Sequence, residues 1–137
     1  MKTTRKRADL RTRKRTGGGG RAAAEPARAV VMLSTAGARD EAERIARALV
    51  DERLAACVNV VAPITSIYRW KGAVERAEEV LLVVKTRTAL TARVATRIRE
   101  LHSYELPEAI VLPIDGGAAD YLAWIAGETT VSGSTRG

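Results

Sequence analysis

Hydrophobic and polar positions repeat with distinct periods from residue 28 onwards, and each period predicts one element. The apolar, β-branched run at residues 29–33 is typical of a buried strand. Apolar side chains then recur at helical spacing, which predicts an amphipathic helix that Asp40 can cap. The apolar stripe of this helix comprises Ala42, Ile45, Ala46 and Leu49.

Residues 57–87 predict a long β-hairpin whose two arms meet at the tight-turn signal Trp70-Lys71-Gly72. The first arm alternates apolar and polar side chains, and Pro63 marks a bend or bulge in it. The second arm contains the continuous apolar run at residues 80–84. A hairpin of this length exposes strand edges and apolar side chains, so we expect helices and other subunits to cover it.

The last third of the chain supplies a second helix and a final strand. Apolar side chains at helical spacing predict a helix over residues 88–102, which Pro107 prevents from continuing. Residues 109–114 predict a strand, and residues 120–125 a short helical turn or strand. The order β-α-β-β-α-β predicts an α+β, ferredoxin-like sandwich: a four-stranded antiparallel sheet with two helices on one face. The other face would be apolar, so we expect another subunit or the C-terminal segment to cover part of it.

Charge is distributed unevenly over the 137 residues and defines the domain boundaries. Residues 1–21 carry nine basic groups and one acidic group, whereas the remainder has 14 basic and 15 acidic residues. We expect residues 1–27 to form a disordered basic, glycine-rich tail, residues 28–128 a single domain, and residues 129–137 a flexible tail. The tail is interpreted as a solvated extension rather than a nucleic-acid or lipid contact. No apolar run fits a secretory signal or membrane span, so the sequence predicts a cytoplasmic protein.

Five strings stand in unbroken order between residues 28 and 128: LAACVN (54–59), ITSIYRWKG (64–72), EVLLVVKT (79–86), HSYELPE (102–108) and DYLAWI (120–125). Together they closely resemble the CutA family of divalent-cation tolerance proteins. The resemblance implies a compact homotrimer whose long hairpins pack across subunits, with an architecture similar to the PII signalling proteins. It also implies a part in tolerance of copper and other divalent metals, without established enzymatic activity. Some members have a cysteine at the place of Ser34, and a metal site built on that thiolate would be absent here.

Few side chains are available for metal chemistry. His102, the only histidine, stands three residues before Glu105, and this N/O pair suits Cu²⁺ or Zn²⁺. The other ligands would be water, a carbonyl or groups of a neighbouring subunit, among them Cys57, the only cysteine. Each also has a structural interpretation: His102 can satisfy the carbonyls at a helix C-terminus, Glu105 can pair with Lys85 or Arg87, and Cys57 can be a small buried hydrophobe.

The resemblance further implies a cleft between subunits that takes a metal ion, a small anion or a small metabolite. The residues carried over to this cleft are Lys85, Thr86, His102, Tyr104 and Glu105. The aromatic side chains Tyr68, Trp70 and Trp124 are interpreted as trimer packing rather than as a ring-stacking ligand surface.

Two functions follow from these observations. The first is a homotrimeric divalent-cation tolerance protein that binds copper or other divalent ions weakly at intersubunit sites. The second is a PII-like sensor or interaction module that binds a small anion or nucleotide in the intersubunit cleft. We expect no enzyme activity and no organic cofactor, because the sequence has neither a nucleophile elbow nor a glycine-rich phosphate loop before a helix.

Overall fold

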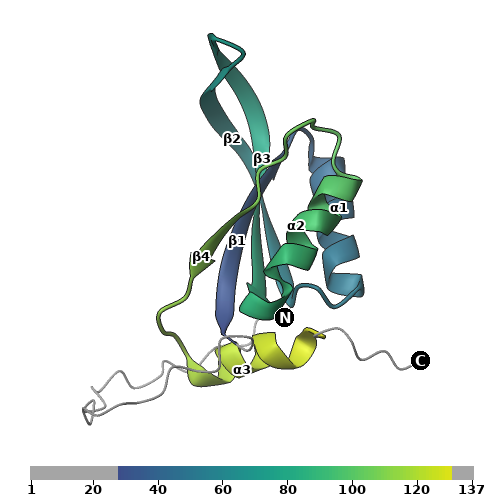
Figure 1. Cartoon of the computed structure of the whole chain (residues 1–137), viewed down its shortest axis with the longest axis vertical. Coiled ribbons are helices and arrows are strands. Elements are labelled where there is room, and N and C mark those ends of the chain that lie inside the picture. The colour runs from purple at the N-terminus through teal and green to yellow at the C-terminus, as the bar shows by residue number, and fades with distance from the viewer. Residues whose placement is uncertain (1–27, 131–137) are drawn as a thin grey trace.

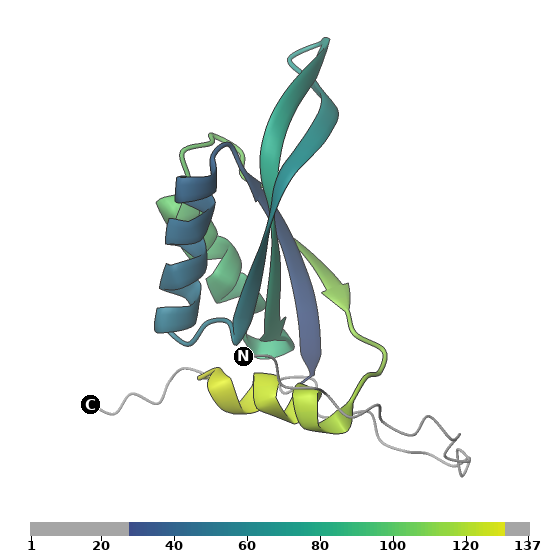
Figure 2. The same ribbon diagram turned by 180° about the vertical axis from the view of Figure 1, so that it is seen from behind.

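The computed structural model describes residues 28–130 and has the βαββαβ order predicted from the sequence, followed by one more helix. The four strands form one antiparallel sheet in the order β2-β3-β1-β4. Helices α1 and α2 lie side by side on one face of this sheet (Figures 1 and 2), which confirms the ferredoxin-like α+β fold. The elements are β1 (Ala29–Ala36), α1 (Arg39–Asp51), β2 (Cys57–Trp70), β3 (Ala73–Arg87), a 3₁₀ turn η2 (Thr88–Leu90), α2 (Thr91–Leu101), β4 (Ile110–Pro113) and α3 (Ala119–Glu128).

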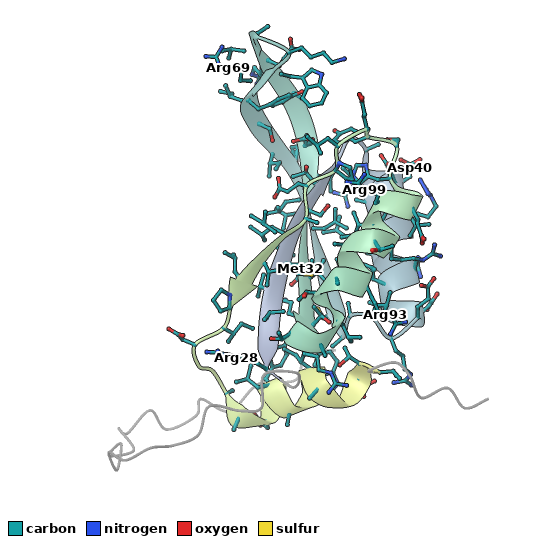
Figure 3. The ribbon with its side chains drawn as sticks, viewed as in Figure 1. Arg28, Met32, Asp40, Arg69, Arg93 and Arg99 are labelled. Atoms are coloured by element: carbon teal, nitrogen blue, oxygen red, sulfur yellow. The ribbon has the colours of Figure 1, made fainter. Side chains whose placement is uncertain are left out.

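The main core lies between the sheet and the helix pair. The predicted stripe of α1 is buried, and α2 contributes Val94 and Ile98. Every second residue of the central strands faces this layer, including Met32 of β1 and Leu82 and Val84 of β3. Met32 lies between the sheet and the helices (Figure 3). Burying an aliphatic side chain contributes about 1.5–3 kcal/mol, so this layer supplies most of the driving force for folding.

The predicted cap of α1 was wrong. The helix begins at Arg39, and its N-cap is Ala38, whose extended backbone makes no side-chain cap hydrogen bond. Asp40 is already helical, and its Oδ1 accepts a hydrogen bond from the N–H of Glu41 at 3.0 Å. Both carboxylates still lie in the first turn, where the helix dipole favours negative charge.

The hairpin forms as predicted. Strands β2 and β3 pair from Cys57 opposite Lys85 to the tip, and a register shift near Pro63 confirms the expected bulge. Lys71 and Gly72 both have positive φ (50° and 84°), as a two-residue hairpin turn requires. The outer half of the hairpin projects beyond the rest of the fold (Figure 2).

Within residues 28–130, no helix packs along the opposite face of the sheet. Residues directly opposite in a ladder share a face, so Val31 and Leu33 of β1 lie beside Leu112 and Ile110 of β4 and beside Lys85 and Val83 of β3. Ile110 and Leu112 are 48% and 45% exposed. The apolar open face expected from the sequence is therefore present in a single chain.

Of the two alternatives predicted for residues 120–125, a short helical turn or a strand, the helical one is confirmed, and the helix α3 extends beyond both ends of this segment. This helix lies across one end of the sheet (Figure 1), where Ile125 is buried against Ala29 and Ala56. The segment after it is anchored, because the carbonyl of Thr129 accepts a hydrogen bond from Arg87 Nη2 at 2.5 Å. The expectations for residues 1–27 and 131–137 lie outside the described residues. Within residues 28–130, no helix combines the length and hydropathy needed to cross a bilayer.

Candidate functional site

A cleft of about 550 Å³ lies between the outer half of the hairpin and the loop that joins α2 to β4. This loop, residues 102–109, runs from the end of α2 past the base of the hairpin to β4 (Figure 1). Strands β2 and β3 contribute the opposite wall, and Arg69 stands at the far end of that hairpin (Figure 3). The cleft lining includes three carboxylates and three aromatic rings: Glu79, Glu105, Glu108, Tyr68, Trp70 and Tyr104.

His102 fastens the start of the α2–β4 loop to the sheet. Its side chain is fully buried, and Nε2 lies 2.6 Å from the carbonyl oxygen of Thr35 in β1. Nδ1 accepts a hydrogen bond from the backbone N–H of Tyr104 at 3.0 Å. The neutral tautomer with its proton on Nε2 satisfies both contacts. Both ring nitrogens are thus engaged, so in this conformation neither presents a free lone pair to a metal ion.

Glu41 provides a second attachment for the same loop. Its Oε2 accepts a hydrogen bond from the Ser103 backbone N–H at 2.7 Å, and its Oε1 accepts one from the Ser103 hydroxyl at 3.1 Å. Burial raises the pKa of Glu41, but the hydrogen bonds from Ser103 and the charge of the neighbouring Arg44 outweigh it, so the pKa is lowered overall. The sequence offered no signal for this contact, because a glutamate in a first helical turn has a sufficient explanation in the helix dipole.

Tyr104 and Glu79 form the floor of the cleft. The Tyr104 hydroxyl donates to Glu79 Oε2 at 2.7 Å, and the ring packs over Gly37, where an added Cβ would lie 3.1 Å from Oη. Burial, followed by the Glu79 carboxylate, raises the pKa of Tyr104 far above its ordinary value, so the phenol keeps its proton. Glu79 is only 9% exposed, and sequence reasoning did not identify it as a site residue.

The cleft is strongly acidic. Burial, and then the charge of Glu79, raises the pKa of Glu108. Among residues 28–130, no ion pair joins a lysine or arginine to Glu79, Glu105 or Glu108. The expected pairing of Glu105 with Lys85 or Arg87 is absent from the described part of the chain.

Three other predicted site residues lie at the opposite end of β3. The ammonium group of Lys85 contacts Asn59 Oδ1 and lies 3.9 Å from the sulfur of the half-buried Cys57. Thr86 is buried, and its hydroxyl donates to the carbonyl of Leu54 at 2.6 Å. Lys85 and Glu79 are six positions apart on β3, roughly 20 Å in an extended strand.

One chain therefore does not bring the predicted ligands together. Glu105 and Tyr104 line the cleft, His102 is buried behind it, and Cys57, Lys85 and Thr86 lie at the other end of the sheet. Within residues 28–130, no three His, Cys, Asp or Glu side chains are grouped so that they could hold a metal ion.

The predicted packing aromatics divide into two groups. Tyr68 and Trp70 line the cleft and are 42% and 38% exposed. Trp124 is 42% exposed on α3, with its ring 5.4 Å from that of Tyr121. Their place in an interface stays a prediction.

Known proteins resemble this chain over almost three quarters of its length. A curated relative from Thermus thermophilus, named "Divalent-cation tolerance protein CutA", is 48% identical over 99 residues, covering 72% of this chain and 96% of that protein. "Protein CutA, chloroplastic" from Arabidopsis thaliana is 40% identical over 100 residues, covering 73% of this chain and 55% of that protein. The chain likewise spans about half the length of the mouse and human relatives, 48% and 47%.

A solved structure and a family model match this chain to the same group of proteins as these relatives. A solved structure described as the "Periplasmic divalent cation tolerance protein CutA from Archaeoglobus fulgidus" has a TM-score of 0.71 and 39% identity, covering 73% of this chain and 97% of that one. The family described as "CutA1 divalent ion tolerance protein" matches residues 30–128. The chain therefore belongs to the CutA1 family of divalent ion tolerance proteins.

Proposed function

We propose that this chain contributes to tolerance of divalent cations as a homotrimer that binds copper or other divalent metal ions weakly at sites shared between subunits. Family membership supports the role in cation tolerance. The single observation that carries the shared-site part is the separation of the candidate ligands in one chain. A divalent ion needs three or four ligands, so a site built from these residues must draw on a neighbouring subunit.

Uncovered apolar surface supports assembly. Ile67 and Val74, on the outer half of the hairpin, are 69% and 63% exposed. The open sheet face adds the exposed side chains of Ile110 and Leu112. Exposed apolar side chains on strands with free edges are typical of a protein interface, because another chain can cover both the side chains and the edges.

The residues of the proposed metal site differ in their roles. Glu105 supplies an exposed carboxylate at the cleft, and His102 acts by holding the loop that carries it. Cys57 would contribute from the far end of a neighbouring subunit, where its sulfur lies beside Lys85. The donors would thus be the Cys57 thiolate and the Glu105 carboxylate, both of which occur as ligands of Zn²⁺ in proteins.

The charge of the cleft favours cations over the PII-like alternative. A nucleotide or small anion would face three carboxylates, and in the described residues no lysine or arginine lines the cleft. We assign the protein no catalytic role. The cytoplasmic location expected from the sequence stays a prediction, because the names of related proteins include a chloroplastic and a periplasmic one.

Light scattering and calorimetry test the two parts separately. We expect a mass of about three times 14.7 kDa, and a mass near that of one chain would refute the trimer. Titration with Cu²⁺, Zn²⁺ and ATP should show metal binding that weakens in Glu105→Gln and Cys57→Ser. Glu128→Gln, a change outside the cleft, is the matched control. Unchanged metal affinity in both site variants, or binding of ATP alone, would overturn the metal assignment.

A further inference from the structure

We propose that His102 is a pH-sensitive switch that holds the start of the α2–β4 loop in place when neutral and releases it when protonated. The switch consists of the imidazole ring, its hydrogen-bond partners in Thr35 and Tyr104, and the carboxylate of Glu41. All of these groups belong to one chain, which already buries the ring fully. Assembly can only add to that burial, so the inference depends on no surface that another subunit covers.

The neutral ring fits both of its contacts. Nε2 lies 2.6 Å from the carbonyl oxygen of Thr35, which can only accept a hydrogen bond, so the proton of the neutral ring stays on Nε2. Nδ1 then carries a lone pair and accepts a hydrogen bond from the Tyr104 N–H at 3.0 Å. Because a backbone N–H can only donate, the two contacts together specify one charge state and one tautomer.

Protonation places two donors opposite each other. A proton on Nδ1 points at the Tyr104 N–H across the same 3.0 Å, so that hydrogen bond is lost. The charged ring is then attracted to Glu41, whose Oε2 lies 3.7 Å from Nδ1, too far for a hydrogen bond. This oxygen already accepts a hydrogen bond from the Ser103 N–H at 2.7 Å, so an imidazolium that turns towards it competes with the second attachment of the loop. One proton therefore weakens both attachments.

The electrostatic surroundings of the ring contain charges of both signs. Although burial opposes it, hydrogen bonds from Ser103 keep the pKa of Glu41 below its ordinary value. This carboxylate is therefore still charged at the pH at which imidazoles take up a proton, and it favours the imidazolium. The charged or titratable groups nearest the ring are Glu41 and Arg44 of α1, Tyr104 of the loop and, beyond the Tyr104 hydroxyl, Glu79 of β3.

Release of the loop start changes how the loop lies against the hairpin. The Tyr104 ring packs against His102, with ring centroids 4.6 Å apart, and its hydroxyl donates to Glu79 at 2.7 Å. Loss of the N–H bond at Tyr104 frees the backbone that carries this ring, and the residues that follow it along the cleft wall move with it. The neutral switch thus holds the loop against β3, and the charged switch lets the loop leave β3.

Nuclear magnetic resonance on the full chain tests the switch with few signals. The chain contains one histidine and three tyrosines, so ¹⁵N labelling of these two residue types gives one imidazole ring and three tyrosine amides. At about pH 8 we expect a neutral ring with its proton on Nε2. On titration to about pH 5, the ring and the Tyr104 amide should shift with the same midpoint. The protection of that amide against hydrogen exchange should fall about tenfold, whereas the amides of Tyr68 and Tyr121 serve as internal controls.

Three variants identify the groups involved. His102→Gln takes up no proton, so the Tyr104 amide should lose its pH response. Glu41→Gln keeps an oxygen that accepts hydrogen bonds but removes the charge that stabilises the imidazolium, so the midpoint of the ring should move to lower pH. Glu43→Gln is the matched control, because Glu43 lies in an exposed ion pair on the same helix, and it should leave the midpoint unchanged. Far-UV circular dichroism at both ends of the titration verifies that the fold is retained.

Several results would overturn the inference. These are a ring that is doubly protonated at about pH 8, a ring that stays neutral until the chain unfolds, or a Tyr104 amide that does not follow the ring. Equal midpoints in Glu41→Gln and Glu43→Gln would do the same. A monomeric mass or absent metal binding would count against the proposed function alone, because every contact of the switch lies within one chain.

Discussion

Replacing His102 with alanine should lower the free energy of unfolding by about 3 kcal/mol, because the ring makes two buried hydrogen bonds that fasten the α2–β4 loop. Each hydrogen bond contributes about 1 kcal/mol net, and each partner left buried without a bond costs about 1–3 kcal/mol. The carbonyl of Thr35 would lose its partner in a residue that is 9% exposed, whereas the Tyr104 N–H can regain water. Leaving the Tyr104 N–H without its partner should therefore cost only the lower end of this range, and the total loss in the free energy of unfolding stays near 3 kcal/mol.

Urea unfolding at a fixed chain concentration measures this loss, since any assembly makes apparent stability depend on concentration. Two further variants test the two hydrogen bonds of His102 separately. His102→Gln can place a donor near the position of Nε2 and keep the Thr35 contact. His102→Asn can place an acceptor near Nδ1 and keep the Tyr104 contact. Each should lose less stability than His102→Ala.

A loss below about 0.5 kcal/mol in His102→Ala would refute the structural role, because two broken buried hydrogen bonds cannot cost so little. Added Zn²⁺ distinguishes a structural role of His102 from a role as a metal ligand. If His102 were a ligand, Zn²⁺ would stabilise the original chain and lose that effect in His102→Gln. We expect the stability differences among these variants to be the same with and without Zn²⁺.

Two other predictions concern polar groups at the edges of the core. Ser34 is fully buried and its hydroxyl has no hydrogen-bond partner among the described residues, so Ser34→Ala should raise the free energy of unfolding by about 1 kcal/mol. Thr86→Val, which removes a hydroxyl bonded to the Leu54 carbonyl, should lower it in the same denaturation assay, and equal signs would contradict the reasoning. Glu41→Gln should destabilise the fold at pH 7 by weakening the bonds to Ser103. Because the folded pKa of Glu41 is lowered from 4.5, its contribution is present above pH 4.5 and is lost as pH falls through that lower pKa, so a difference from the original chain that stays constant down to pH 3 would contradict it.

Local patterns were sufficient for the order of the elements. The spacing of Ile45 and Leu49 placed α1 on the sheet, and the Lys71-Gly72 pair fixed the hairpin turn, because a two-residue turn needs positive φ at both positions. The cap of α1 was misassigned because Asp40 is a good capping residue by type, yet the extended Ala38 is the N-cap, so the helix starts two residues earlier than a cap at Asp40 would place it. Residue type gives only a preference for where a helix begins, and the backbone path of the preceding residues decides the actual position.

The functional site depended on contacts that no local pattern contains. The sequence identified His102, Tyr104 and Glu105 as one string, but His102 turns to Thr35, 67 positions away, and leaves only Tyr104 and Glu105 at the cleft. Glu79 lines the cleft because of its register position on β3 and because the distant α2–β4 loop folds over it. By itself, the sequence determined the elements and their order, since periodicity and turn chemistry act over a few residues. Only the tertiary structure decided which side chains line the cleft together and which already use their polar atoms in hydrogen bonds. These outcomes depend on packing between segments far apart in the chain.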